Sequence, residues 1–414
     1  MSHNKLIVIL VGLPARGKSF ISKKLNRYST WVGYNSKVFN VGNYRREFFK
    51  NTFNDNKFFD SNNSEAKNLR DKFAMDVLEE LIKWMNTITG NVVSIFDATN
   101  TTKLRRSMLI KRLSKENIDI MFVESICDKK NIIEKNLEMK LTNDDYVQMP
   151  ASVALDDFKK RISHYKRVYQ TIDDDEDNSY IKIINVQKSF HVFKINSALK
   201  LELCNFLMNL NLNINSGKIY LSRHGESMDN VNGTIGGNSV LSRMGKQYSL
   251  KLFTHIHNDD NDINTIYTST LKRTIETSKP FSKKYNIINK KFLDEINAGI
   301  CDGMTYDQIK IIYPDISKDR KKDKLNYRYP YGESYTDIIE RLKYFILDLE
   351  RTEECTMIIT HTAVLRCLLG YFLDIPLKDI AYIDVPLHRI IKLESVANHY
   401  EKTEINLLKK KEIN

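Results

Sequence analysis

Residues 6–19 read Leu-Ile-Val-Ile-Leu-Val-Gly-Leu-Pro-Ala-Arg-Gly-Lys-Ser, and this stretch decides the fold of the first half of the chain. The apolar run has the length of a buried strand, and Phe20, Ile21 and Leu25 begin a helix-like spacing behind it. Between the two, residues 12–19 match the pattern GxxxxGK[ST]. A strand, a glycine-rich loop and a helix thus follow one another in the order that a phosphate-binding loop (P-loop) requires.

The glycine-rich loop predicts a site for a nucleoside triphosphate. Glycines let successive backbone N–H groups converge on one phosphate, and the helix start adds N–H donors and the positive end of its dipole. Lys18 is expected to reach the β- and γ-phosphates, and the Ser19 hydroxyl is expected to bind Mg²⁺. We therefore expect a nucleoside triphosphate and Mg²⁺ at this loop. The residues expected at the nucleotide are Gly12, Leu13, Pro14, Ala15, Arg16, Gly17, Lys18 and Ser19.

Length and composition limit the class of protein. With 414 residues the chain is longer than one typical domain, so we expect two. The sequence shows neither a membrane-spanning stretch nor a signal peptide, and five widely spaced cysteines without a CxxC pair favour the cytoplasm. The net charge of +12 fits nucleic acid or small anionic substrates. Basic residues are spread along the whole chain without interleaved aromatics, which favours small substrates and no nucleic acid.

Both halves of the chain alternate strand-like and helix-like segments, which indicates an α/β fold with mostly parallel sheets. A polar break at residues 211–216 separates them, and we expect domains at residues 1–214 and 215–414. The expected strands are residues 6–11, 37–41, 92–96, 118–123, 218–221, 263–267 and 356–360. Helical spacing covers residues 74–85, 197–212 and 338–349. Residues 51–64 and the acidic run 173–177 are expected to be solvated loops, and residues 409–411 a frayed basic tail.

The first half carries the residues that phosphoryl transfer needs. Asp97 ends a strand-like run, where a P-loop fold places the carboxylate that organises Mg²⁺ beside Ser19. We therefore expect Asp97 to be a metal ligand and a catalytic residue. Phosphoryl transfer also requires cations, and arginine suits a sugar phosphate because its planar fork can hold two oxygens. The candidate cations are Arg45, Arg46, Arg70, Arg105, Lys140 and Arg161.

The second half carries the residues of a histidine phosphatase. His224 follows the strand-like run 218–221, and His361 follows the run 356–360. The carboxyl ends of parallel strands meet at one edge of a sheet, so the two histidines should lie together. A neutral imidazole can attack phosphorus and hold the phosphoryl group, which makes His224 the expected nucleophile. The remaining candidates are Glu295 as proton donor and Arg223 and Arg273 as cations.

Taken together, these motifs resemble the 6-phosphofructo-2-kinase/fructose-2,6-bisphosphatase family over nearly the whole chain. The first half contains Val11-Gly-Leu-Pro-Ala-Arg-Gly-Lys-Ser19 and Phe96-Asp-Ala-Thr-Asn-Thr-Thr102 in the family's order. The second half contains Arg223-His-Gly-Glu226, Tyr327-Arg-Tyr-Pro330 and Ala363-Val-Leu-Arg-Cys-Leu368. The resemblance implies two three-layer α/β domains. The first would be a P-loop NTPase-like, mostly parallel sheet, and the second a histidine-phosphatase (phosphoglycerate-mutase-like) sheet.

For the kinase half, the resemblance assigns roles residue by residue. It implies that Asn136 lies at the ATP site and that Lys18, Asp97 and Cys127 are catalytic residues. The residues implied to bind fructose 6-phosphate are Arg45, Arg70, Thr99, Arg105, Lys140, Arg161 and Tyr165.

For the phosphatase half, the resemblance implies that His224 forms a phosphohistidine and Glu295 protonates the leaving group. The residues implied to clamp the phosphoryl group are Arg223, Asn230, Arg273 and His361. The residues implied to bind the rest of the sugar bisphosphate are Gly236, Tyr306, Arg320, Lys324, Tyr335 and Arg366. Two positions depart from the family pattern: Thr234 stands where many members carry arginine, and Thr362 where glutamine is common.

Three functions are compatible with the sequence. The leading one is a bifunctional enzyme that makes and hydrolyses fructose 2,6-bisphosphate and so regulates glycolysis. The second is a kinase whose phosphatase half is weak or only structural, which the two threonines motivate. The third is a polynucleotide kinase/phosphatase, which the positive charge motivates. For partners, we expect the small-molecule substrates and no membrane, and the resemblance implies a homodimer.

Overall fold

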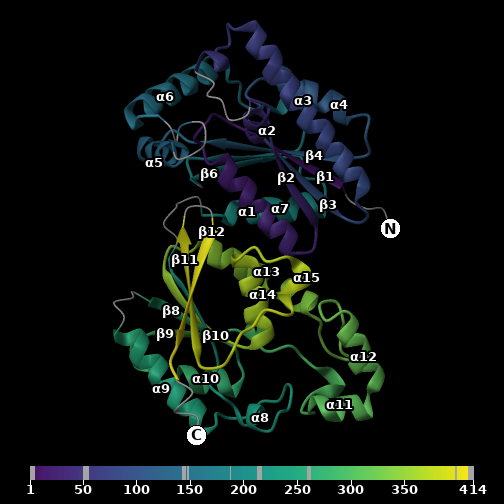
Figure 1. The fold of residues 1–414 in the computed structure, drawn as a ribbon, viewed down its shortest axis with the longest axis vertical. Helices are drawn as coiled ribbons and strands as arrows, with labels where there is room; N and C mark the ends of the chain where they lie inside the picture. The colour runs from purple at the N-terminus through teal and green to yellow at the C-terminus, as the bar shows by residue number, and fades with distance from the viewer. Residues whose placement is uncertain are drawn as a thin grey trace. The chain divides into compact units, whose positions relative to one another are not determined.

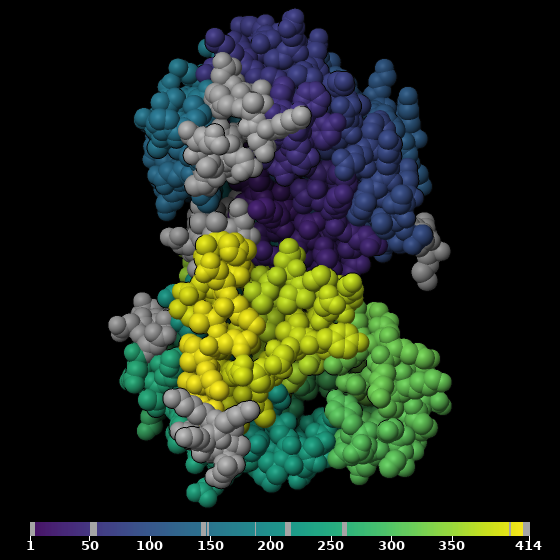
Figure 2. Space-filling view, viewed as in Figure 1, coloured from purple at the N-terminus to yellow at the C-terminus, as the bar shows by residue number. Residues whose placement is uncertain are grey.

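The computed structural model describes residues 5–49, 56–141, 146, 149–186, 188–211, 217–258, 263–396 and 399–408. The chain forms two compact units, Met1–Asn213 and Ile214–Asn414, and each is described here by itself (Figure 1). In the space-filling view of Figure 2 the first unit runs from purple to blue-green and the second from green to yellow. Within the described residues, no helix is both long enough and apolar enough to span a membrane.

The first unit is built on a six-stranded sheet of strand order β2-β3-β1-β4-β5-β6. Its strands are β1 (Lys5–Val11), β2 (Asn35–Asn40), β3 (Val92–Asp97), β4 (Asp119–Ile126), β5 (Tyr180–Ile184) and β6 (Ser189–Phe193). All neighbours pair in parallel except β5 and β6, which are antiparallel. The expected mostly parallel sheet is confirmed. Both β5 and β6 were missed, because they are short and β6 is largely exposed at the edge of the sheet.

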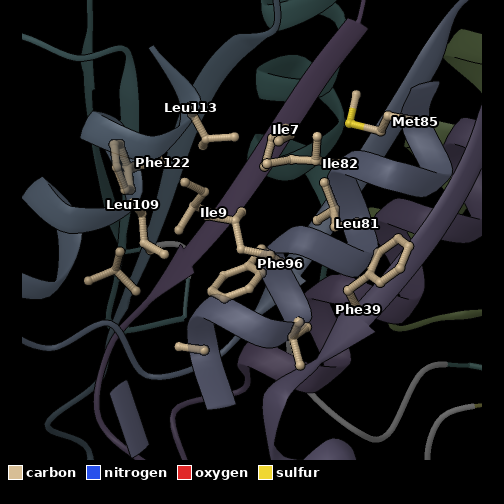
Figure 3. Close-up of a cluster of buried hydrophobic side chains, with 14 of the residues drawn as sticks. Ile7, Ile9, Phe39, Leu81, Ile82, Met85, Phe96, Leu109, Leu113 and Phe122 are labelled. Atoms are coloured by element: carbon tan, nitrogen blue, oxygen red, sulfur yellow. The ribbon is translucent and has the colours of Figure 1, made fainter. Parts of the chain in front are cut away.

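Helices cover both faces of this sheet. They are α1 (Lys18–Trp31), α2 (Val41–Phe48), α3 (Ser64–Thr87), α4 (Lys103–Leu113), α5 (Lys130–Leu141), α6 (Ala151–Val168) and α7 (Ala198–Asn209). On one face Ile7 and Ile9 of β1 pack with Leu81 of α3 and Leu109 of α4 (Figure 3). The alternate residues of β1 are equally buried on the other face, where α1 and α7 stack Tyr28 on Phe206. Burial on both faces explains why β1 is a continuous apolar run.

Two segments of the first unit differ from the sequence expectation. Residues 51–64 were expected to be a loop, but Asn56–Phe59 forms a 3-10 helix, η1, and Ser64 already begins α3. Residues 51–55 lie outside the described residues. The acidic run 173–177 was expected to be a solvated loop; its four aspartates are exposed as expected, but Asp174–Glu176 forms a second 3-10 helix, η2. Its Glu176 is held by the fully buried Arg106, with 2.7 Å between Arg106 Nε and Glu176 Oε2.

The second unit is also built on a six-stranded sheet, of strand order β12-β11-β7-β10-β8-β9. Its strands are β7 (Ile219–Arg223), β8 (Ile263–Thr268), β9 (Asn286–Asn289), β10 (Cys355–Thr360), β11 (Arg389–Val396) and β12 (His399–Asn406). The four strands from β7 to β9 are parallel, whereas β11 pairs antiparallel with both β7 and β12. The sequence analysis did not predict β9, β11 or β12. The expected tail at residues 409–411 lies outside the described residues.

The helices of the second unit again flank the sheet on two sides. They are α8 (Met228–Val231), α9 (Arg243–Asn258), α10 (Lys272–Ser278), α11 (Tyr306–Ile312), α12 (Pro314–Lys322), α13 (Tyr335–Arg351), α14 (Thr362–Phe372) and α15 (Leu377–Ile380), with 3-10 turns η3 (Lys279–Lys283), η4 (Lys291–Leu293) and η5 (Gly299–Cys301). Tyr248 and Leu252 of α9 pack on Tyr220 of β7 and Met357 of β10. The long helices α13 and α14 contact each other, and α14 contacts β7.

The buried Arg106 predicts a large loss of stability when it is replaced. Besides Glu176, its guanidinium donates to the carbonyl oxygens of Asn100 at 3.1 Å and Gln170 at 2.9 Å. We expect Arg106→Met to lower the free energy of unfolding by about 3–5 kcal/mol, because a carboxylate and two carbonyls lose their donor. Tryptophan fluorescence during urea unfolding reports on this unit, since both tryptophans, Trp31 and Trp84, belong to it.

The matched control is Arg112→Met. Arg112 is paired with Glu79 and Glu116 at a partly exposed site. Its replacement should lower the free energy of unfolding by about 1 kcal/mol or less, because solvent screens such pairs. Equal losses in the two variants would contradict the assignment of Arg106 as a structural cation.

Candidate active sites

The glycine-rich loop joins β1 to α1 at the carboxyl edge of the first sheet. Gly12 has φ +139°, and a Cβ there would lie 2.5 Å from the carbonyl oxygen of Ser125. The Gly12 N–H donates to the Thr99 carbonyl at 2.9 Å, and Gly17 has φ +80°. Larger residues would be excluded from the first position by contact and disfavoured at both positions by the backbone. The backbone thus turns in the way the pattern predicts.

Lys18 is a buried cation inside this loop. Its Nζ donates to the Leu13 carbonyl at 2.6 Å. Burial lowers the pKa of Lys18 to about 7, an effect that attraction to Asp97 opposes and that the nearby cations Lys140 and Arg16 reinforce. An anionic ligand at the loop would restore the ordinary affinity of Lys18 for its proton.

Asp97 lies at the end of β3, directly opposite Asn40 of β2 in the parallel register. Its Oδ2 accepts hydrogen bonds from Asn40 Nδ2 at 2.6 Å and from Ser22 Oγ at 3.4 Å. The Ser19 hydroxyl lies 3.4 Å from Lys140 Nζ, and burial lowers the pKa of Lys140 while Asp97 attracts its charge.

These oxygens fit Mg²⁺ at a phosphate site. Mg²⁺ prefers hard oxygen ligands, and proteins hold it with one or two side chains together with substrate phosphates and water. A carboxylate from Asp97 and a hydroxyl from Ser19 meet that description. Among the described residues, no group of three or more His, Cys, Asp or Glu side chains is placed to hold a metal ion.

Three of the expected sugar-phosphate arginines gather on the rings of η1. Arg161 Cζ lies 3.8 Å from the ring centre of Phe59, and Arg45 Cζ lies 5.1 Å from the same centre. Arg70 Cζ lies 5.8 Å from the ring centre of the neighbouring Phe58. The expected Tyr165 also contacts this cluster, since its ring centre is 6.0 Å from that of Phe59.

Of the remaining candidates in the first unit, some contact the glycine-rich loop and others interact with neighbouring side chains. Asn136 Nδ2 donates to the Ala15 carbonyl at 3.2 Å, so it does reach the glycine-rich loop. Arg105 is already paired with Asp71, and Arg46 donates to Asn43. Cys127 is buried just after β4, where its interaction is with Arg16 of the loop.

In the second unit, nearly all expected site residues line one cavity of about 420 Å³. The expected residues in its lining are Arg223, His224, Asn230, Gly236, Arg273, Glu295, Tyr306, Arg320, Lys324, Tyr335 and Arg366. Of the residues proposed for this half, His361 alone is absent from the lining. It is fully buried directly behind the cavity, with its ring centre 5.1 Å from that of His224.

Strand register brings the two histidines together. Parallel β7 and β10 pair Arg223 with Thr360, so the next residue of each strand is a histidine at the same edge. The backbone N–H of His224 donates to the Thr360 carbonyl at 3.0 Å, which fixes the ends of β7 and β10 side by side.

The hydrogen bonds of the two imidazoles define which nitrogen is available. His224 Nδ1 lies 2.7 Å from the Gly225 carbonyl, which only accepts, so Nδ1 carries the proton and Nε2 keeps its lone pair. Arg273 Nε donates to His361 Nδ1 at 3.2 Å, so His361 Nε2 carries the proton and donates to Ser269 Oγ at 2.7 Å. Of the two imidazoles, His224 is therefore the one with an unprotonated nitrogen, Nε2, facing the cavity.

Burial also keeps both imidazoles neutral. It lowers the pKa of His224 well below its ordinary value, and the adjacent cations Arg273 and Arg223 lower it further. The pKa of His361 is lowered for the same reasons, with Arg273 again the leading charge. A neutral imidazole is the reactive form for attack on phosphorus.

Glu295 is fixed at the amino end of α14. Its Oε2 accepts from the Thr362 N–H at 3.2 Å, and its Oε1 accepts from the Ala363 N–H at 3.1 Å. Arg273 NH1 donates to the Gly237 carbonyl at 2.8 Å, and Arg223 NH1 donates to the Val385 carbonyl at 3.0 Å. The Glu295 carboxyl and the two guanidinium groups therefore line the same cavity as His224.

The same cavity is lined by further cations. Arg366 NH1 donates to the Tyr335 hydroxyl at 2.9 Å, and Arg320 NH2 donates to the Tyr306 hydroxyl at 3.3 Å. Burial, together with repulsion from Arg366 and Arg320, lowers the pKa of Lys324 to about 8. Two cationic groups in one cavity suit a substrate with two phosphates.

Sequence reasoning missed several residues at both sites. Phe58 and Phe59 fell in a segment taken for a loop, although two adjacent aromatics in a polar stretch signal burial. Tyr329 and Asp229 also line the second cavity. Asp229 Oδ2 lies 4.0 Å from Arg273 NH1, and Arg320 Cζ lies 5.9 Å from the Tyr329 ring centre. Tyr329 is buried and belongs to the quoted motif Tyr327-Arg-Tyr-Pro330, to which no role was given, whereas no signal in the sequence distinguished Asp229 from other charged residues.

The two departing threonines both line the second cavity. Thr234 Oγ1 donates to the Asp229 carbonyl at 3.3 Å, and the Thr362 N–H is one of the two that hold Glu295. Both threonines therefore face the cavity, and Thr362 directly follows His361 in the chain.

Comparisons with known proteins agree with both halves. The family model "6-phosphofructo-2-kinase" matches residues 1–214, and "Histidine phosphatase superfamily (branch 1)" matches residues 219–407. The 6-phosphofructo-2-kinase/fructose-2,6-bisphosphatase of Aquarana catesbeiana is 42% identical over 399 residues, covering 96% of this chain and 83% of that protein. The Caenorhabditis elegans enzyme of the same name is 40% identical over 405 residues, covering 96% and 88%.

A yeast relative carries a shorter name. The 6-phosphofructo-2-kinase 1 of Saccharomyces cerevisiae is 42% identical over 422 residues, covering 95% of this chain and 51% of that protein. The matches extend over both units, as the sequence motifs predicted. The chain belongs to the 6-phosphofructo-2-kinase/fructose-2,6-bisphosphatase family.

Proposed function

We propose that the chain is a bifunctional enzyme that phosphorylates fructose 6-phosphate with ATP and hydrolyses fructose 2,6-bisphosphate through a phosphohistidine, and so regulates glycolysis. The observation that carries the proposal is the second cavity. A neutral histidine with a free Nε2 lines it, together with enough cations to suit a second phosphate.

In the kinase unit, the chain's own residues would bind and orient both substrates. The backbone N–H groups of the glycine-rich loop and Lys18 would hold the phosphates of ATP, while Arg161 and Arg45 would hold the phosphate of the sugar. Mg²⁺, held by Asp97 and Ser19, would neutralise phosphate charge when bound. Asp97 would accept the proton of the attacking sugar hydroxyl, and Lys18 would stabilise the charge that develops on the transferred group.

In the phosphatase unit, the reaction would have two steps. His224 Nε2 attacks the phosphorus at O2 of the sugar, the P–O2 bond breaks, and Glu295 gives its proton to the leaving oxygen. Water then attacks the phosphohistidine, Glu295 takes a proton from it, and the P–N bond breaks to restore neutral His224. Arg223 and Arg273 neutralise the phosphoryl oxygens in both steps, and His361 supports Arg273.

A second reading keeps the kinase and makes the phosphatase unit weak or only structural. It is favoured by Thr234 and Thr362 in the cavity lining and by the yeast relative whose name mentions only the kinase. Radiolabelled phosphate from fructose 2,6-bisphosphate on His224 would exclude this reading. Family membership favours sugar phosphates over a polynucleotide, and a cheap gel-shift assay at moderate salt tests that choice.

Assembly and location are also proposals. We propose a homodimer on the basis of the family resemblance, and analytical ultracentrifugation tests it. A cytoplasmic location stays a prediction from the cysteine pattern.

Separate active sites predict reciprocal losses. Lys18→Ala should lower phosphorylation of fructose 6-phosphate by about 10²-fold or more, because a transition-state cation is removed, and should spare hydrolysis. His224→Ala should abolish phosphoenzyme formation and spare the kinase. Paired assays of both rates on purified protein measure these effects.

Loss of both activities in either folded variant would show that the sites are not separate. Leu250→Ala serves as the control, since Leu250 is exposed on α9 and should change neither rate.

The lowered pKa of His224 predicts an unusual pH dependence. Because burial and Arg273 hold its pKa below the ordinary value, His224 should stay neutral as the pH falls through about 6.5. At pH 6 an imidazole with the ordinary pKa would be about three-quarters protonated, and only its neutral fraction could react. The rate of phosphoenzyme formation at pH 6 should clearly exceed the rate that this neutral fraction would allow. Rapid-quench measurement of labelled enzyme between pH 5 and 8 tests this point.

The control is Arg273→Met. Removing a positive neighbour raises the pKa of His224. The acid limb of the variant's pH profile for phosphoenzyme formation should therefore move to higher pH, and the overall rate of that step should fall. Substrate ionisation is common to both proteins and cancels in the comparison. Identical acid limbs near pH 6.5 would rule out the electrostatic role given to burial and Arg273.

A further inference from the structure

We propose that Phe59 is the positioning residue of the sugar-phosphate site in the first unit, an inference that rests on the proposed kinase function. Its ring lies beneath two guanidinium groups from different helices, Arg45 of α2 and Arg161 of α6. The 3.8 Å between Arg161 Cζ and the ring centre is close stacking.

Phe59 itself is firmly held. Its side chain is 4% exposed, and Asp157 of α6 anchors η1 by accepting from the Asn56 N–H at 2.9 Å and from Asn56 Nδ2 at 2.8 Å. On the other side, Arg70 of α3 donates to the Phe58 carbonyl and stacks on the Phe58 ring. The turn is therefore tied to two helices, and the ring is a fixed support rather than a loose side chain.

The ring solves an electrostatic problem of this site. Two guanidinium groups within about 6 Å of one point repel each other, yet a phosphate needs both. The negative face of an aromatic ring attracts a cation without removing its charge. Arg105 shows the alternative, since it is paired with the carboxylate of Asp71 and its charge is neutralised there.

The aromatic contacts of Phe59 extend to Tyr165, which is also expected to bind the sugar phosphate. Tyr165 lies on the same helix as Arg161, one turn further on, and its ring centre is 6.0 Å from that of Phe59. Phe158 lies on the other side of Arg161, at 5.5 Å from its Cζ. Phe59 thus sets the place of Arg161 relative to Arg45, and with it the spacing of the cations that would meet one phosphate.

The test is a steady-state comparison of the kinase activity in the full chain. Phe59→Leu removes the ring and should raise KM for fructose 6-phosphate about tenfold, as expected for loss of a desolvated cation–π contact. The KM for ATP and the kcat should change less than about twofold. Phe59→Tyr keeps the ring and should retain a KM near that of the wild type.

The matched control is Phe206→Leu, which removes an equally buried ring of the same unit that stacks on Tyr28. It should lower the melting temperature like Phe59→Leu and leave KM for fructose 6-phosphate unchanged. If Phe59→Leu does not fold, Phe59→Met fills a similar volume without a ring and should show the same selective rise. An unchanged KM, or equal rises for ATP and fructose 6-phosphate, overturns the inference.

The two proposals can fail separately. A wild-type protein that does not phosphorylate fructose 6-phosphate overturns the proposed function and the inference with it. A wild-type protein that does so, with Phe59 variants that bind the sugar phosphate normally, overturns the positioning role alone.

Discussion

Parallel pairing of neighbouring strands that end in register is the constraint on which both sites depend. Pairing of β7 with β10 sets Arg223 beside Thr360, so two histidines 137 positions apart by their numbers, 224 and 361, emerge at one edge. Pairing of β2 with β3 sets Asn40 beside Asp97 in the same way. A shift of one residue in the register of either strand pair would turn the side chains of the shifted strand to the other face of the sheet, and the residues of that site would no longer lie together.

Burial of positive or protonatable groups is the second common feature. Lys18, His224, His361, Arg223, Arg273 and Lys324 all have a pKa lowered chiefly by burial. In the first unit, ring faces of Phe58 and Phe59 hold further cations. A phosphate at these sites would stabilise the positive charges that burial disfavours, so the same electrostatics favour binding of an anionic substrate.

Elements with strong local signals could be predicted, and elements without them could not. The strands with apolar runs, such as β1 and β3, and the amphipathic α13 were predicted to within a few residues. Short or exposed strands, such as β6 and β12, bury little apolar surface of their own and exist because a neighbour supplies hydrogen bonds. The η1 turn was missed for a related reason, since Phe59 is buried through contacts of the turn with α6, which is distant in the sequence.

The sequence alone determined the chemistry: a glycine-rich loop after an apolar strand, histidines after two others, and the arginines that phosphates require. Local backbone rules fix those features because they depend on a few consecutive residues. The tertiary structure decided the partners of each cation, pairing Arg105 with Asp71 and Arg106 with Glu176 while setting Arg161 on the ring of Phe59. Such pairings depend on contacts between segments far apart in the chain, which no local pattern encodes.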